Sequence, residues 1–94
     1  MRVYHRTDHA DAIVRESFRN ATNTYMTASE FSGVWVADRP LDPNEGAWGR
    51  FVIALDVPES ELEPYEWVEE GRFYREFLVP AELLNGRPLD VVQD

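Results

Sequence analysis

One short stretch constrains the fold of this chain more than any other: residues 73–80, which read FYREFLVP. Successive side chains of a β-strand point to opposite faces of a sheet. Large apolar groups on both faces are typical of a strand that is covered on both sides, and we expect such a strand here. One face would carry Phe73, Arg75, Phe77 and Val79, and the other Tyr74, Glu76 and Leu78.

Glu76 is the only acidic residue of this stretch. Burying a carboxylate among apolar side chains is costly unless a cation pairs with it or the site is a wet cleft. Two interpretations of Glu76 therefore stay open. In the first it faces solvent at a sheet edge or pairs with an arginine, either Arg50, Arg72 or Arg75. In the second it lies in a cleft and takes part in chemistry.

Composition narrows the classes of protein that remain. The chain has 94 residues and no cysteine, which predicts one domain over residues 1–94 and excludes disulfides and thiolate metal sites. A formal net charge of −9 argues against a surface that binds nucleic acid by neutralising phosphates. No apolar run approaches the ~20 residues that cross a bilayer, and residues 1–14 lack the apolar core of a secretory signal. We expect a cytoplasmic protein without a membrane partner.

Periodicity and turn signals predict the remaining elements. After a strand at residues 2–6, Thr7 and Asp8 are good N-cap residues for an amphipathic helix. Its apolar face would carry Ala10, Ile13, Val14, Ser17 and Phe18, and its wet face His9, Asp11, Arg15 and Glu16. Further strands are expected at 33–37, 50–57 and 88–92, a hairpin at 65–68 and 73–79, and helical turns at 58–63 and 80–84. Residues 20–32 are expected to form a loop with a possible short strand at 25–27.

These elements predict an α+β fold that is compact and mostly antiparallel, with five to seven short strands and one main helix after the first strand. His5 lies in that first strand and shares a face with Val3, so it is either a satisfied core histidine or a site residue. His9 would lie on the exposed face of the helix. The two histidines do not share a helix, and no acidic cluster stands at ligand spacing, so we expect no metal site.

Three stretches, in order, resemble ADP-ribosyltransferase-like domains of the diphtheria-toxin type and their RNA 2′-phosphotransferase relatives. Residues 3–7, VYHRT, followed directly by a helix, are similar to the opening of that family. Residues 33–40, GVWVADRP, resemble its next strand, and residues 74–80, YREFLVP, its late glutamate-bearing strand. Arg6 stands where the family has glycine and is a candidate for the diphosphate of NAD, and Ala37 stands where serine or threonine is typical. The resemblance implies the ADP-ribosyltransferase-like fold, with NAD as substrate.

The resemblance also implies roles for single residues. His5 would bind ribose hydroxyls of NAD, beside Thr7 of the same motif. Trp35 or Tyr25 would stack on nicotinamide. Glu76 would polarise the 2′-hydroxyl of the nicotinamide ribose and stabilise oxocarbenium character, a role that suits a fixed carboxylate in a water-poor cleft. His5 and Glu76 should then open on one cavity.

Three functions follow as alternatives. The leading one is NAD-dependent ADP-ribosyl transfer to an unknown protein or nucleic-acid acceptor, by a small toxin or modifying enzyme. The second is a non-catalytic module that keeps the fold and binds a protein or nucleotide ligand. The third is an acidic inhibitor of a nucleic-acid-binding protein, with a protein partner at residues 59–70. That run contains Glu59, Glu61, Glu63, Glu66, Glu69 and Glu70.

Overall fold

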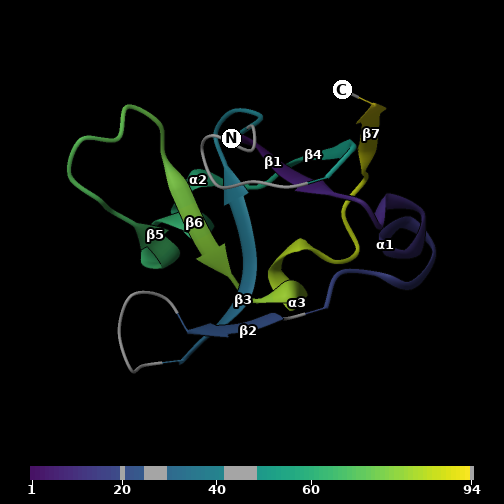
Figure 1. Ribbon diagram of the computed structural model, residues 1–94, viewed down its shortest axis with the longest axis horizontal. Helices are drawn as coiled ribbons and strands as arrows, with labels where there is room; N and C mark the ends of the chain where they lie inside the picture. Colours follow the sequence, from purple (N-terminus) through teal and green to yellow (C-terminus); the bar gives the residue numbers. More distant parts are fainter. Residues whose placement is uncertain (20, 25–29, 42–48, 94) are drawn as a thin grey trace.

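The computed structural model describes residues 1–19, 21–24, 30–41 and 49–93 of the chain. Its strands are β1 (Arg2–Thr7), β2 (Ala21–Thr24), β3 (Glu30–Ala37), β4 (Phe51–Asp56), β5 (Glu66–Trp67), β6 (Glu76–Val79) and β7 (Asp90–Gln93). Its helices are α1 (Ala10–Glu16), α2 (Glu59–Leu62) and α3 (Ala81–Leu84), with a 3₁₀ turn, η2 (Glu63–Tyr65). The predicted α+β class is confirmed, and the seven strands of the described residues fall within the predicted range of five to seven. Figure 1 shows their arrangement.

The strands of the described part join one antiparallel network. Along it the order is β5-β6-β3-β1-β4-β7, and β2 pairs with β3 beside this path. β1 therefore lies between β3 and β4. It pairs with β4 along its whole length, but among the described residues it forms a single pair with β3, between Tyr4 and Ala37. The two strands diverge beyond that pair, and this divergence shapes the site described below.

The register divides the sheet into two faces, because residues paired across antiparallel strands point to the same side. We call the helix-covered side the core face and the other the second face. The core face carries Val3, Val36, Ile53, Leu55, Phe77 and Val79, each at most 1% exposed. The helices add Ala10, Leu62, Ala81 and Leu84 to the same core. The second face carries Tyr4, Trp35, Ala37, Trp67, Glu76 and Leu78.

Two prolines start the short helices that cover the core face. Pro58 and Pro80 are the N-cap residues of α2 and α3. Proline has no N–H to leave unsatisfied at a helix start, and its fixed φ suits this position. Each helix then places a leucine, Leu62 or Leu84, fully inside the core. Burying such a side chain contributes about 1.5–3 kcal/mol.

The helix after β1 is shorter than its sequence pattern predicts. α1 ends at Glu16, and Phe18 is buried from the segment beyond it. The prediction that Val14 lies on the apolar face is wrong, because Val14 is 56% exposed. A helix of this length meets the core along a narrow stripe, here Ala10 and Ile13. Val14 lies about 100° around the helix axis from Ile13, so its side chain points away from the core.

Two other boundaries differ from the prediction. β2 and the start of β3 occupy part of the stretch expected to be a loop, whereas residues 25–27, with Tyr25, lie outside the described residues. β2 and β3 pair over four residues, so tertiary pairing overrides a polar composition there. β6 begins at Glu76 because its partner β3 ends at Ala37, to which Glu76 pairs. Phe73 is consequently 85% exposed in the loop that precedes the strand.

Candidate functional site

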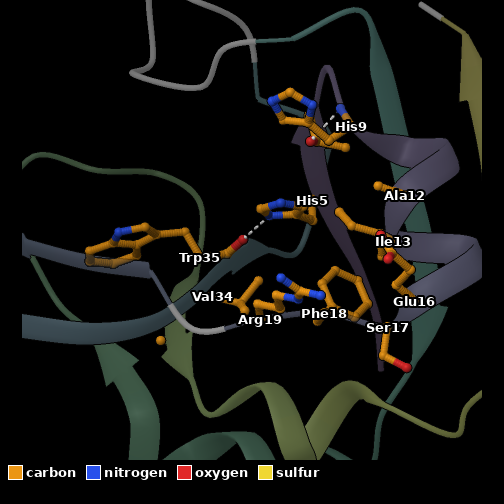
Figure 2. A pocket seen from close by; sticks show the side chains of 12 residues that line it. His5, His9, Ala12, Ile13, Glu16, Ser17, Phe18, Arg19, Val34 and Trp35 are labelled. Atoms are coloured by element: carbon orange, nitrogen blue, oxygen red, sulfur yellow. Dashed lines mark hydrogen bonds between the residues drawn. The ribbon is translucent and has the colours of Figure 1, made fainter.

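A pocket of about 350 Å³ opens between β1, α1 and the middle of β3 (Figure 2). This volume falls in the range of ligand sites, about 300–1,000 Å³, which combine apolar walls with a few placed polar groups. Ile13, Phe18 and Val34 supply apolar walls, and His5, Glu16 and Arg19 supply polar groups. The pocket therefore has the mixed lining expected of a small-molecule site.

His5 is the polar side chain of the pocket with the best-defined geometry. Its Nδ1 lies 2.7 Å from the backbone oxygen of Trp35. A carbonyl oxygen only accepts hydrogen bonds, so Nδ1 must carry the proton and donate it. The ring of Phe18 packs edge-on against the imidazole, with centroids 5.7 Å apart and an interplanar angle of 76°. The imidazole is thus fixed from two sides.

Burial also keeps this imidazole neutral. Burial lowers the pKa of His5 below 6.5, and the hydrogen bond to the Trp35 carbonyl, which favours the protonated ring, offsets part of that effect. A neutral ring with its proton on Nδ1 has Nε2 as a hydrogen-bond acceptor. His5 is therefore suited to accept a hydrogen bond from a ligand hydroxyl or N–H group.

The divergence of β1 from β3 explains why His5 reaches this carbonyl. His5 pairs with Ile53 of β4 on one side. On the other side, the described pairing of β1 with β3 is at Tyr4, one residue before His5. A carbonyl that leaves a ladder needs another donor, and the imidazole supplies it to Trp35.

Gly33, two residues before Trp35 on β3, has φ +154°, and a Cβ there would meet the backbone oxygen of Val79 at 2.7 Å. Glycine is required for this close approach of β3 to β6.

Thr7 lies at the end of β1, where α1 begins, and is buried at 8% exposure. Its Oγ1 accepts the backbone N–H of His9 at 2.9 Å, so it ties down the turn into the helix. The helix N-cap is His9, which makes no side-chain capping bond, so the prediction that Thr7 or Asp8 is the N-cap is wrong. Asp8 instead accepts the backbone N–H of Arg50 at 3.0 Å.

The segment that follows α1 forms another part of the pocket and has an unusual backbone. Ser17 has φ 81° and ψ 166°, a region that only glycine adopts at little cost. Next to it, both backbone groups of Phe18 bond to the side-chain amide of Asn85, the C-cap residue of α3. Sequence reasoning missed Phe18 and Arg19 in the pocket lining and Asn85 as the residue that holds Phe18, because the local pattern shows neither the pocket nor this contact.

Glu76 lies away from this pocket. Tyr4 pairs with Ala37, and Ala37 pairs with Glu76, so these three side chains share the second face. His5 follows Tyr4 directly and therefore points to the core face. Glu76 is not among the residues that line the pocket. The expectation that His5 and Glu76 open on one cavity is wrong: they belong to one sheet but to opposite faces of it.

Glu76 belongs instead to a small ion-pair network. Arg72 pairs with both Glu76 and Glu69, the latter at 2.9 Å. Glu69 also accepts the indole N–H of Trp67 at 2.8 Å. Burial raises the pKa of Glu76, and the Arg72 guanidinium offsets part of that rise. For Arg72 the balance is opposite: burial lowers its pKa, but the nearby carboxylates raise it overall. This geometry matches the interpretation of Glu76 as an arginine-paired glutamate.

Trp35 and Arg6 also have their side chains away from the pocket. Trp35 contributes its carbonyl to the site, while its indole extends away from His5 (Figure 2). The indole packs edge-on against that of Trp67, with ring centroids 5.4 Å apart. Arg6 donates from Nε to the carbonyl of Leu41 and from Nη1 to that of Gly49, 3.1 Å away. Of the residues that the resemblance implies, the structure brings His5 and Thr7 together with the backbone of Trp35.

The acidic run at residues 59–70 is less negative than its sequence suggests. In the structure, four of its six glutamates pair with arginines. Arg75 pairs with Glu59 at 3.3 Å and Glu66 at 3.0 Å, Arg87 with Glu61 at 3.1 Å, and Arg72 with Glu69. A protein partner at this face stays a prediction.

Among the described residues, no group of three or more histidine, aspartate or glutamate side chains is placed to hold a metal ion. No helix in that part of the chain is both long and apolar enough to cross a membrane. Comparisons with protein-family models, with curated proteins and with solved structures find no match to this chain. Its function must therefore be inferred from its own residues.

Proposed function

We propose that this chain is an ADP-ribosyltransferase-like domain whose pocket beside His5 binds NAD. The observation that carries the proposal is the neutral imidazole of His5, held with Nδ1 on the Trp35 carbonyl, which leaves Nε2 to accept a ribose hydroxyl. The family resemblance implies the same role for this histidine. Arg19 on the pocket lining suits a phosphate oxygen.

The geometry supports NAD binding more directly than ADP-ribosyl transfer. Transfer would need a carboxylate beside the nicotinamide ribose, and the carboxylate that the resemblance implies for this role is Glu76. It lies on the face opposite His5 and pairs with Arg72. This observation favours a second candidate function, a module that binds NAD or a related nucleotide without turnover.

Calorimetric titration with NAD tests the binding proposal. His5→Ala should weaken NAD binding by on the order of tenfold, equivalent to ~1.4 kcal/mol, the upper end of a neutral hydrogen bond. Trp67→Ala is the control, because it removes an aromatic side chain from the opposite face. NAD binding that survives His5→Ala but is lost in Trp67→Ala would move the site to the second face. Absence of binding by the unaltered protein at millimolar NAD would refute the proposal.

Release of nicotinamide from NAD separates the two candidates. A transferase should release nicotinamide. If Glu76 acts as the resemblance implies, Glu76→Gln should slow that release by on the order of a hundredfold, the scale of losing one electrostatic stabiliser. Unchanged release in Glu76→Gln would show that this carboxylate, on the face opposite His5, takes no part in transfer. Binding affinity for NAD should stay unchanged in the same variant. Saturable NAD binding without nicotinamide release would select the binding module.

A further inference from the structure

The His5 pocket is braced by a residue far away in the sequence. The Asn85 side chain accepts the Phe18 backbone N–H on Oδ1 at 2.8 Å and donates from Nδ2 to the Phe18 carbonyl at 3.2 Å. One amide therefore fixes both backbone groups of a residue 67 positions earlier. Asn85 is itself held at the end of α3, because its backbone N–H donates to the Ala81 carbonyl at 3.0 Å.

The residue before Phe18 shows that this arrangement is imposed and not locally preferred. Ser17 has a backbone conformation that is costly for any residue with a Cβ. Such conformations persist where the surrounding structure enforces them, and they concentrate at functional sites. Two hydrogen-bonded restraints act here: the Ser17 N–H donates to the Ile13 carbonyl at 2.8 Å, and the Asn85 amide holds both backbone groups of Phe18. Of the two, the Asn85 amide is the one that a side-chain substitution removes, and we expect its loss to let Ser17 relax and Phe18 shift.

Phe18 connects this restraint to the site. It is 4% exposed, and its ring packs edge-on against the His5 imidazole. The other titratable or charged side chains that line the pocket are His9, Glu16 and Arg19. A shift of the Phe18 ring would open the imidazole to water and change the shape of the pocket wall beside it.

We propose that Asn85 is a positioning residue for the pocket: it holds Phe18 against His5 by forcing Ser17 into a strained backbone. That this positioning serves ligand binding rests on the proposed NAD site. The placement of the imidazole itself is a property of the free protein and is measured without ligand.

The first test follows the His5 imidazole by NMR titration of the free protein, with His9→Gln used to assign the two histidine signals. Asn85→Ala should raise the titration midpoint of His5, because water then reaches the ring. Arg87→Ala is the matched control. Arg87 lies in the same turn as Asn85, and its replacement removes hydrogen bonds to the Leu83 carbonyl (2.8 Å) and to the Glu61 carboxylate (3.1 Å). Neither bond involves Phe18. An equal change in both variants, or no change in Asn85→Ala, would overturn the proposal.

The second test repeats Asn85→Ala in a Ser17→Gly background. Glycine adopts the observed φ without strain, so the segment has less reason to move when the amide is lost. The midpoint shift caused by Asn85→Ala should therefore be smaller in the glycine background than in the unaltered protein. A shift of full size there would show that strain at Ser17 plays no part. This background also keeps the test available if Asn85→Ala alone does not fold.

Titration with NAD tests whether Asn85 also affects ligand binding. Asn85→Ala should weaken NAD binding by on the order of tenfold (~1.4 kcal/mol), and Arg87→Ala should leave it unchanged. An unaltered protein that binds no NAD refutes the proposed function alone, because the midpoint measurements still decide whether Asn85 positions His5. A moved midpoint with unchanged NAD affinity refutes the role of Asn85 in binding alone.

Discussion

Replacing Ser17 with glycine should stabilise this protein. Ser17 has φ 81° and ψ 166° and is exposed, so its side chain has little packing to lose. A residue with a Cβ pays about 1–3 kcal/mol in that region of backbone space. Glycine avoids this cost, but it gives the unfolded chain more conformational freedom, which lowers the free energy of unfolding by roughly 0.5–1 kcal/mol. The balance is a gain of about 1 kcal/mol in the free energy of unfolding, or roughly 4–8 °C in melting temperature for a domain of this size.

Urea denaturation followed by circular dichroism measures this difference directly. Ser60→Gly is the matched control, because it makes the same chemical change inside α2, where the backbone is helical. There glycine should cost roughly 0.5 kcal/mol relative to serine. The two variants should therefore change stability in opposite directions. A Ser17→Gly protein that is no more stable than the unaltered chain would refute the claim that the backbone at Ser17 is strained.

Three further predictions follow from the pKa shifts of Glu76 and His5 and from the close packing at Gly33. Burial raises the pKa of Glu76, so its contribution to stability is present below pH 4.5 and lost as pH rises through the folded pKa. Glu76→Gln should therefore keep or raise the melting temperature at pH 7 and lose that gain at pH 4; a clear drop at pH 7 would mean that the pair with Arg72 dominates. Burial lowers the pKa of His5, so its contribution is present above pH 6.5 and lost as pH falls through the folded pKa. When the pH is lowered from 7 to 5, the free energy of unfolding should fall less in His5→Asn than in the unaltered protein. Equal falls would contradict a neutral imidazole whose pKa is lowered by burial. Gly33→Ala should lower the free energy of unfolding, since its Cβ would lie 2.7 Å from the Val79 oxygen, and an unchanged value would show that β3 moves freely there.

Much of the sheet could be predicted because its pattern is local. The alternation of Phe51, Ile53 and Leu55 predicts a strand on which these residues share one face, and β4 has Ile53 and Leu55 in the core. The prolines before α2 and α3 mark helix starts through their own backbone chemistry. In these cases the residues that specify the element are the residues that form it.

The site depends on pairings between distant parts of the chain, and those could not be predicted. Glu76 reaches the second face through a register that runs from β1 across β3 to β6. A slip of one residue anywhere in that path would exchange the faces, and no sequence pattern fixes it. The hydrogen bond of His5 likewise depends on where β1 leaves β3, and the place of Phe18 depends on Asn85.

The most direct measurement of the central claim is an NMR titration of the protein with NAD, which reports at once on the His5 imidazole, the Phe18 amide and the tryptophan indoles. NAD bound in the proposed pocket should shift the His5 and Phe18 signals saturably, and leave the indole of Trp67 on the second face unchanged. Unmoved His5 signals at millimolar NAD, or shifts confined to the indoles, would contradict the claim that this pocket binds NAD.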